Sequence, residues 1–226
     1  MKSALVTGGS SGIGLAIARA LSEDGFALTL AARKVERLDG AARELEAHAV
    51  QADVTSEDDC VRVVAEHVER HGGMDVLVNS AGVGIAGPIA DLSTKRWDLQ
   101  QSVNLRGAFL VTRESLPHLR LTHGHVVNVA SIAGTMPTPG LAGYGASKAA
   151  LVSLTHSLNR EEADNGVRAV ALCPAFVETP MTEWTGLPSE ELIQPEDCAE
   201  LVRAVLRLSP RARVAELVVE RVGDAY

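Results

Sequence analysis

The sequence has 226 residues, 46% of them hydrophobic, so it can bury one substantial core and does not divide obviously into two domains. Its 29 acidic and 21 basic residues give a formal net charge of -8, which argues against binding to nucleic acid or to an anionic membrane. The absence of a C-x-x-C pair and of any membrane-length apolar run, with a strand pattern beginning at Lys2, predicts a cytoplasmic protein with reduced thiols.

Short apolar segments rich in valine, leucine and alanine recur along the chain and predict β-strands. They cover 2–7, 26–32, 48–52, 74–79, 124–130, 167–173 and, more weakly, 214–220. The stretches between them are long enough for helices, and the apolar spacing of Ile13, Ile17 and Leu21 is helical. This alternation predicts an α/β fold, in which a doubly wound parallel sheet of about seven strands carries helices on both faces. We expect a single domain over residues 1–226.

The first predicted strand runs into a glycine-rich turn, Thr7-Gly8-Gly9-Ser10-Ser11-Gly12-Ile13-Gly14, which a helical pattern follows. Glycines allow the backbone to approach a pyrophosphate, and the N–H groups at a helix start favour its negative charge. An ordinary glycine-serine turn is the alternative, but the position in the first strand-to-helix turn favours a dinucleotide-binding Rossmann fold. The expected contacts are Gly8, Ser10, Ser11, Gly12, Ile13 and Gly14. Leu15 and Ala16 after Gly14 exclude a P-loop.

The second predicted strand ends in Ala32-Arg33-Lys34, where a dinucleotide fold usually carries an acid for the adenosine ribose. Arg33 and Lys34 can instead pair with a 2′-phosphate, so NADP(H) is favoured and NAD(H) is possible. Alternatively, both cations simply end the strand in solvent. Asp53, after the third strand, is expected to accept a hydrogen bond from the adenine amino group or to cap the following helix.

Tyr144 and Lys148 lie one turn apart at the start of an apolar helical stretch. A phenol with a pKa of about 10 needs a fall of roughly three units to be half ionised near neutrality. The lysine ammonium, the helix N-terminus and a nicotinium charge act in that direction. Ser131, at the end of the fifth strand, is expected to hold a substrate oxygen while Tyr144 transfers the proton. A snorkelling lysine and a strand-ending serine are the alternatives, which the accompanying glycine loop disfavours.

Jointly these motifs resemble the short-chain dehydrogenase/reductase family over nearly the whole chain up to about residue 180. The matching motifs are Thr7-Gly8-x-x-x-Gly12-x-Gly14, Asp53-Val54, Asn79-Ser80-Ala81-Gly82, Asn104, Ser131, Tyr144-x-x-x-Lys148 and Pro174-x-x-Val177-x-Thr179. The resemblance implies that Tyr144 is the general acid/base, that Ser131 orients the substrate oxygen, and that Lys148 binds the nicotinamide ribose and lowers the tyrosine pKa. It implies that Asn104 holds a water in a proton relay. The remaining implied cofactor contacts are Val54, Asn79, Ala81, Gly82, Pro174, Val177 and Thr179, of which Val177 and Thr179 face the nicotinamide carboxamide.

Three features depart from the family pattern. Ser80 stands where a second asparagine is usual, Ala175 replaces a glycine, and the C-terminal VAELVVERVGDAY lacks the common Val-Asp-Gly-Gly ending. The proline-rich segment 175–195 is predicted to be a substrate loop containing one short helix, because it follows a strand at its carboxyl end. Phe176 and Trp184 flank this loop, and we hypothesise that they line an apolar substrate pocket.

The predicted function is therefore an NADP(H)- or NAD(H)-dependent oxidoreductase that interconverts an alcohol and a ketone or aldehyde. Its expected partners are a small-molecule substrate and further copies of itself, in a homodimer or homotetramer, with no nucleic acid or membrane. A non-catalytic dinucleotide-binding sensor or partner-binding subunit is the alternative, against which Asn104, Ser131, Tyr144 and Lys148 argue. Epimerase or dehydratase chemistry shares Tyr144 and Lys148 but expects a larger C-terminal domain.

Histidines complete the candidate residues. His67 and His71, four apart on a predicted helix, have a spacing that can bind metal, but no third ligand is adjacent in sequence. We predict that they lie on a solvated helix face and that the protein holds no metal. His118, His123 and His125 are predicted to lie on the surface.

Overall fold

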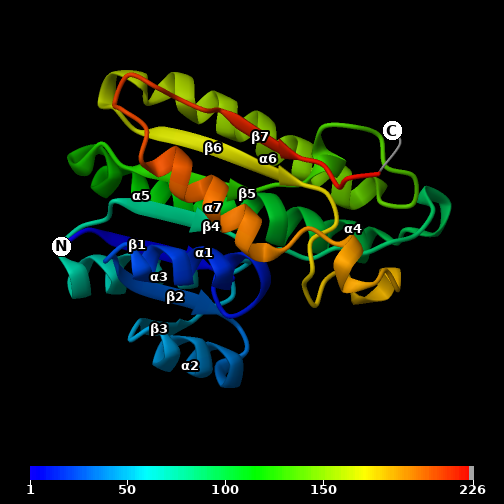
Figure 1. The fold of residues 1–226 in the computed structure, drawn as a ribbon, viewed down its shortest axis with the longest axis horizontal. Coiled ribbons are helices and arrows are strands. Elements are labelled where there is room, and N and C mark those ends of the chain that lie inside the picture. Colours follow the sequence, from blue (N-terminus) through cyan, green and yellow to red (C-terminus); the bar gives the residue numbers. More distant parts are fainter. Residues whose placement is uncertain (224–226) are drawn as a thin grey trace.

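The computed structural model describes residues 1–223, through which seven parallel strands run as one sheet (Figure 1). The strands are β1 (Ser3–Thr7), β2 (Ala27–Ala32), β3 (His48–Gln51), β4 (Val76–Asn79), β5 (His125–Val129), β6 (Arg168–Pro174) and β7 (Glu216–Val219). Six of them lie entirely inside a predicted apolar segment and β6 extends one residue beyond its segment, so the predicted fold class is confirmed. The last three residues of the expected domain, 224–226, lie outside the described residues.

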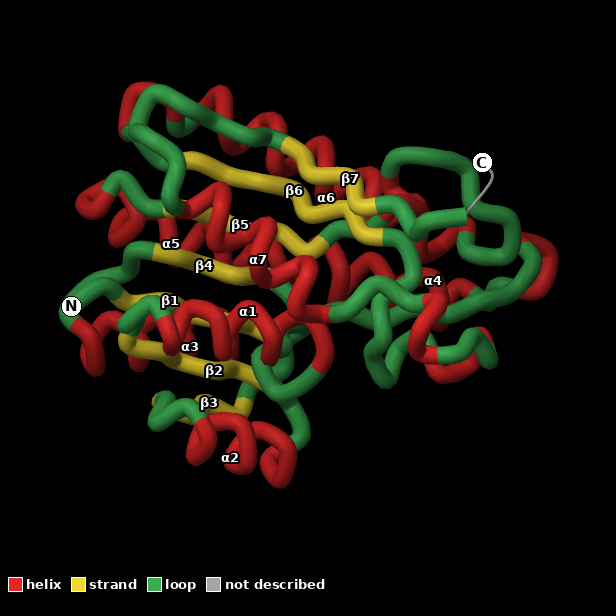
Figure 2. Tube along the Cα trace, viewed as in Figure 1, coloured by secondary structure: helices red, strands yellow, loops and turns green. Residues whose placement is uncertain are grey.

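Helices cover both faces of this sheet (Figure 2). They are α1 (Gly12–Glu23), α2 (Val35–Glu44), α3 (Glu57–His71), α4 (Thr94–Gln101), α5 (Ala108–Thr122), α6 (Ala142–Glu161) and α7 (Pro195–Leu206). One apolar core joins α1, α2 and α7 to the sheet, and a second joins α3, α5 and α6 to the other face. Strand β1 serves both cores, because Ala4 and Val6 point to the first and Leu5 to the second. This two-sided burial explains why the strands are apolar at nearly every position.

The strand order β3-β2-β1-β4-β5-β6-β7 places a topological switch point between β1 and β4. From β1 the chain adds β2 and then β3 on one side, and it then crosses over to place β4 on the other side of β1. Thr7 at the end of β1 is in register with Ala31 of β2 and with Asn79 of β4. The loops that follow these strands therefore begin at the same edge, where open α/β sheets bind ligands.

His67, predicted on a solvated face, is fully buried between α3 and the sheet, so that prediction is wrong. Its Nδ1 lies 2.9 Å from Oγ1 of Thr29 and its Nε2 lies 3.2 Å from Oγ of Ser3. The Ser3 hydroxyl donates to the carbonyl of Gly73, so Ser3 accepts from Nε2–H and His67 accepts from Thr29 at Nδ1. Thr29 in turn lies 3.0 Å from Nε2 of His71. The sequence did not reveal these partners, because both are strand residues far from α3 along the chain.

His125 is also less accessible than predicted, with an Nε2 atom that is buried and has no hydrogen-bond partner among the described residues. Burial lowers the pKa of His125 to about 4 and that of His67 to about 3. Within residues 1–223 no group of three or more His, Cys, Asp or Glu side chains is arranged to hold a metal ion.

We expect acid to destabilise the fold through His67. The pKa of the His67 imidazole is 6.5 in the unfolded chain and about 3 in the folded chain. The folded state is therefore fully stabilised above pH 6.5, and this stability is lost as the pH falls toward 3, because the unfolded chain then binds a proton that the folded chain does not. The difference in the free energy of unfolding is on the order of 5 kcal/mol. Urea unfolding across this pH range measures it, and His67→Gln should flatten the pH dependence. Ser157→Ala, at an exposed position of α6 and without a titratable group, is the control that should retain the wild-type slope. Equal slopes in all three proteins would contradict this assignment.

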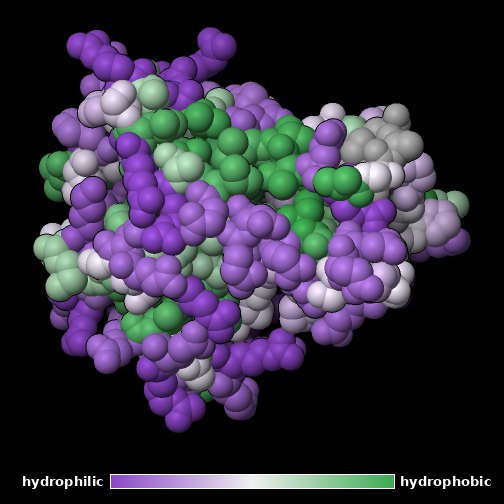
Figure 3. All heavy atoms as spheres, viewed as in Figure 1, coloured by the Kyte–Doolittle hydropathy of each residue, from purple (hydrophilic) through white to green (hydrophobic). Residues whose placement is uncertain are grey.

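On the face shown in Figure 3, hydrophobic residues gather over β7 and its surroundings. Val214, Leu217 and Val219 are partly buried there, and Val218 is 49% exposed. This strand is the last in the sheet order, so one of its edges carries no neighbouring strand among the described residues. No helix within residues 1–223 has the length and apolarity needed to cross a membrane.

Candidate active site

A cleft of about 670 Å³ opens at the carboxyl edge of the sheet. Its lining comes from the loops after β1, β2, β3, β4, β5 and β6, together with the start of α6. Sixteen predicted site residues line it: Gly8, Ser10, Ser11, Gly12, Ile13, Arg33, Asp53, Val54, Ala81, Gly82, Ser131, Tyr144, Lys148, Pro174, Val177 and Thr179. The three others, Gly14, Asn79 and Asn104, lie behind its surface and hold its walls in place.

The glycine loop has a backbone that only glycine adopts easily. Gly8 has φ of +67°, and a Cβ there would lie 2.7 Å from the backbone nitrogen of Ala81. Gly12 has φ of +53°, and its Cβ position is 3.0 Å from Cγ2 of Thr179. Gly14 packs on the loop from inside, since a Cβ there would lie 2.5 Å from the carbonyl oxygen of Gly8. The glycines therefore bring the loop against the segments after β4 and β6.

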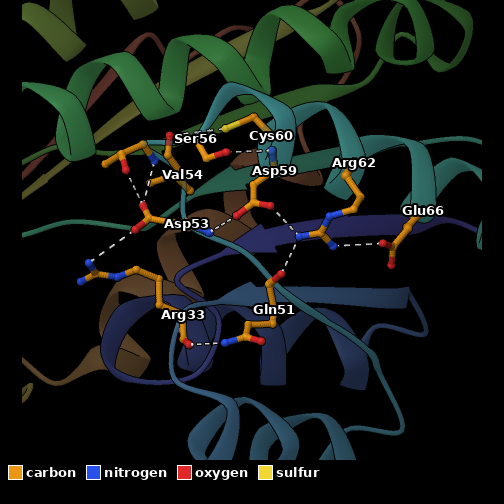
Figure 4. A network of polar contacts seen from close by, with 10 residues as sticks. Arg33, Gln51, Asp53, Val54, Ser56, Asp59, Cys60, Arg62 and Glu66 are labelled. Carbon is orange, nitrogen blue, oxygen red and sulfur yellow. Dashed lines mark hydrogen bonds and ion pairs between the residues drawn. The ribbon is translucent and has the colours of Figure 1, made fainter.

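Basic residues line one end of the cleft. Arg33, Lys34 and Arg37 follow β2 and enter the first turn of α2. Nη1 of Arg33 lies 3.8 Å from Oδ2 of Asp53, and both side chains are more than one-third exposed (Figure 4). These cations give this end of the cleft a positive charge, although the whole chain is acidic.

Asp53 is fixed by its own loop. Its Oδ1 accepts from the backbone N–H and the hydroxyl of Thr55, at 2.9 and 2.8 Å. Its backbone N–H donates to Oδ2 of Asp59, whose other oxygen accepts from Arg62 (Figure 4). The N-cap of α3 is Ser56, so the alternative in which Asp53 caps that helix is wrong. Asp53 instead closes a tight turn and faces the basic end of the cleft.

Ser131, Tyr144 and Lys148 meet at the other side of the cleft. The Ser131 hydroxyl donates to the carbonyl of Pro174 at 3.4 Å and accepts from the N–H of Ala133, and it lies near enough to the Tyr144 phenol to influence its pKa. Lys148 is 4% exposed and donates from Nζ to the carbonyl of Val129 at 2.7 Å. That Nζ lies 5.7 Å from the centre of the Tyr144 ring. Helix α6 thus presents both side chains to the end of β5, as their one-turn spacing predicts.

Burial dominates the electrostatics of these groups. It raises the pKa of the Tyr144 phenol, and the nearby Ser131 hydroxyl only partly opposes this. Burial also lowers the pKa of the Lys148 ammonium to about 8. The sequence led us to expect a lowered tyrosine pKa, and the structure gives the opposite direction, because the low-polarity surroundings of the phenol disfavour its charged form. Additional positive charge beside the phenol is needed to ionise it near neutrality.

Asn104 lies in a π-helical turn, Ser102–Gly107, between α4 and α5. Its Oδ1 accepts from the N–H of Val83 at 2.8 Å, and its Nδ2 donates to the carbonyl of Val83 and to the Ser147 hydroxyl, each at 2.9 Å. The carboxamide is therefore occupied in joining the loop after β4 to α6. Irregular turns of this kind are frequent at functional sites, because they redirect side chains within a helix.

Asn79 has an equally internal position. Its Nδ2 donates to Thr112 and to Asn128, at 3.0 and 2.9 Å, and its residue is 4% exposed. The side chain joins β4 to β5 and to α5, so it supports the sheet below the cleft. Ser80, the unusual residue of this motif, lines the cleft beside it.

Sequence reasoning missed three parts of the lining. Arg37 was overlooked because it lies on a helix, although it follows Arg33 by one turn. The segment 136–141 also lines the cleft, and its prolines, Pro137 and Pro139, were the available signal. Met181 also lines the cleft, with its Sδ 3.6 Å from the Cβ position of Gly84. The predicted loop 175–195 contains two short 3-10 turns, Glu183–Thr185 and Ser189–Glu191, rather than one helix.

Comparison with known proteins finds close likenesses over the full chain. Residues 2–187 match the family model for short chain dehydrogenase. An uncharacterized oxidoreductase of Staphylococcus epidermidis is 38% identical over 227 residues, covering 98% of this chain and 97% of its own. The solved alcohol dehydrogenase of the archaeon Thermococcus sibiricus, complexed with 5-hydroxy-NADP, is 34% identical with a TM-score of 0.94, covering 100% of this chain and 99% of that one. A variant actinorhodin polyketide ketoreductase with NADPH is 34% identical with a TM-score of 0.88, over 97% and 95% of the two chains.

Proposed function

Because the chain belongs to the short-chain dehydrogenase family, we propose that it is an NADP(H)-dependent oxidoreductase that interconverts an alcohol and a ketone or aldehyde. The observation that carries the proposal is the meeting of Ser131, Tyr144 and Lys148 in the cleft that the glycine loop also lines. A protein that only bound a dinucleotide would need the glycine loop but not this phenol, hydroxyl and ammonium.

The residues of the cleft fit a dinucleotide phosphate. Side chains at Gly8 and Gly12 would strain the backbone and fill the space before the first turn of α1, whose N–H groups favour a pyrophosphate. Arg33, with Lys34 and Arg37, offers charged donors suited to a 2′-phosphate. Gly82 leaves room beside the Lys148 ammonium, since its Cβ position lies 3.6 Å from Nζ. The alcohol dehydrogenase and ketoreductase that resemble this chain were solved with NADP-type ligands, which supports the same choice.

The protein side of the reaction is proton transfer and orientation. The bound nicotinamide supplies or accepts the hydride. Tyr144 gives its phenolic proton to the substrate oxygen in reduction and takes it back in oxidation, while Ser131 holds that oxygen by a hydrogen bond. Lys148 stabilises the phenolate by its charge and is placed to bind a ribose hydroxyl. Asn104 keeps the loop after β4 and the start of α6 in register through Val83 and Ser147.

The test compares NADPH and NADH as cofactors for reduction of a panel of ketones and aldehydes, followed by the absorbance of the reduced cofactor. We expect turnover with NADPH to be favoured. Arg33→Ala should lower kcat/KM for NADPH by about 10- to 100-fold, because it removes a charge-assisted contact, and should change kcat/KM for NADH less than about threefold. Arg70→Ala, at an exposed position of α3, is the matched control. Equal losses with both cofactors would contradict the role of Arg33, and binding without any turnover would favour the sensor alternative.

We further propose that the protein acts as a homodimer or homotetramer in the cytoplasm. The exposed apolar edge at β7 supports self-association, and the buried free thiols of Cys60, Cys173 and Cys198 support a reducing compartment. The mass in solution by light scattering tests the first part, which a monomer at high concentration would contradict. Fractionation of the source cells tests the second.

A further inference from the structure

The two ends of the cleft differ in charge. Among the described residues that line it, the charged side chains are Arg33, Lys34, Arg37, Asp53 and Lys148. The first four lie at the end reached by the loops after β2 and β3. Lys148 is buried, and its Nζ already donates to the carbonyl of Val129. The walls beyond Tyr144, built by segments 136–141 and 176–184, contribute no charged side chain to the lining.

Those two walls are apolar where they face the cleft. Met136, Pro139 and Leu141 come from one wall, and Phe176 and Trp184 from the other. The rings of Phe176 and Trp184 meet edge to face, with centroids 6.3 Å apart and planes at 81°. Trp184 is 62% exposed, which leaves a large part of its indole surface free at the rim. An apolar group placed between the walls would cover this surface.

Two hydroxyl groups of the same walls, those of Thr138 and Thr182, are already paired within the protein. The Thr138 hydroxyl donates to the carbonyl of Met136 at 3.4 Å. The Thr182 hydroxyl contacts the carbonyls of Val177 and Thr179, at 2.6 and 2.9 Å. Ser131 and Tyr144 both line the cleft next to these walls, and one carbonyl or hydroxyl oxygen of a substrate can accept from both hydroxyls once Ser131 gives up its 3.4 Å bond to Pro174.

The space next to Tyr144 is narrow on one side. The Cβ position of Gly84 lies 3.7 Å from Cδ2 of the Tyr144 ring and 3.6 Å from Sδ of Met181. Glycine at this position keeps the space between the Tyr144 ring and the Met181 thioether open. A flat group attached to the carbonyl carbon fits this geometry better than a branched, hydrated one, because the thioether and the ring edges offer apolar contacts.

We propose that the substrate is an uncharged carbonyl compound, or the matching alcohol, whose carbonyl carbon carries an aromatic or extended apolar group, and that Phe176 and Trp184 hold this group. The inference rests on the proposed oxidoreductase function. A carboxylate or phosphate on the substrate would lose its hydration between these walls without gaining a partner. An apolar group gains by burial, at about a fourfold increase in affinity for each buried methylene.

The first experiment measures kcat/KM for reduction by NADPH with matched ketones. Acetophenone and 4-acetylbenzoate share the ring and the ketone and differ in one carboxylate. We expect acetophenone to be preferred by about a hundredfold. In the series from 2-butanone to 2-octanone, kcat/KM should rise by about fourfold for each of the first few methylenes.

Variants at Trp184 then assign the effect to this wall. Trp184→Ala should lower kcat/KM for acetophenone about tenfold, mainly through KM, and change 2-butanone little. Trp184→Phe should retain most of the wild-type value, and Trp184→Arg should raise the relative rate with 4-acetylbenzoate by supplying a cation. Leu121→Ala, 82% exposed on α5, is the control that should leave all rates unchanged.

The outcomes separate the two proposals. Turnover in which 4-acetylbenzoate equals or exceeds acetophenone, or in which Trp184→Ala leaves every KM unchanged, would overturn the apolar-substrate inference and leave the oxidoreductase function standing. NADPH binding without oxidation by any ketone or aldehyde would overturn both. Preference for acetophenone that is lost selectively in Trp184→Ala supports both.

Discussion

Tyr144→Phe is expected to reduce kcat by about a thousandfold, within the range that general acid-base groups contribute. The variant keeps the ring and the contacts of α6, and removes only the hydroxyl that lies near Ser131. Because the phenol lies deep in the cleft, phenylalanine should pack in its place without loss of fold. The measurement is the steady-state rate of ketone reduction by NADPH, together with the dissociation constant of NADPH.

The dissociation constant of NADPH distinguishes a loss of catalysis from a loss of structure. NADPH should bind to Tyr144→Phe within about threefold of wild type, since the glycine loop and the basic end of the cleft are untouched. Ser153→Ala, an exposed position of the same helix, is the matched control and should retain full activity. A Tyr144→Phe enzyme that retained more than one-tenth of the wild-type kcat would remove this phenol from the proton-transfer step.

Lys148→Met is expected to lower kcat/KM at neutral pH by about 10- to 100-fold and to move the pH profile to higher pH by one unit or more. Burial already raises the Tyr144 pKa, so loss of the nearby ammonium leaves the phenolate still less favourable. Lys148→Arg restores a cation and should recover part of the shift. A uniform fall in rate at every pH, without a displaced profile, would reduce Lys148 to a structural role.

Stability provides an independent check on the same residue. Because the pKa of Lys148 is lowered from 10.5 to about 8, the unfolded chain binds this proton more tightly than the folded chain does. Wild-type stability should therefore rise as the pH increases from 8 to 10.5, by on the order of 3 kcal/mol. Lys148→Met should lack that rise in urea unfolding measurements. A parallel rise in the variant would show that other groups cause it.

The sequence predicts the sheet well because strands buried on both faces have an apolar signal at nearly every position. All seven strands and the glycine turn between β1 and α1 could be located for this reason. Long-range polar contacts leave no such signal. His67 follows Val63 and Val64 by four and three residues and so shares their buried face of α3, but only the structure shows that Ser3 and Thr29 of the sheet pair with its ring nitrogens.

In the candidate site, too, the positions of residues could be predicted from the strand pattern, whereas their long-range polar contacts could not. Residues attached to strand ends, such as Ser131, could be placed because parallel strands end at one edge of the sheet. The side-chain pairing of Asn104 with Val83 and Ser147 could not, since it depends on a π-helical turn that has no clear sequence pattern. The Tyr144 pKa was also beyond reach, because burial decides its direction and burial depends on the walls 136–141 and 176–184.

The packing of α1 on α7 has a consequence for synthesis of the chain. The buried face of α1, including Ile17 and Leu21, belongs to the same core as Cys198 and Val202 of α7. Arg203 of α7 also binds Asp24 just after α1. A ribosome makes α1 more than 170 residues before α7, so this apolar face stays uncovered until Pro195–Leu206 has emerged. Nascent chains that stall before residue 195 therefore expose the apolar face of α1, which makes them targets for chaperones and proteases.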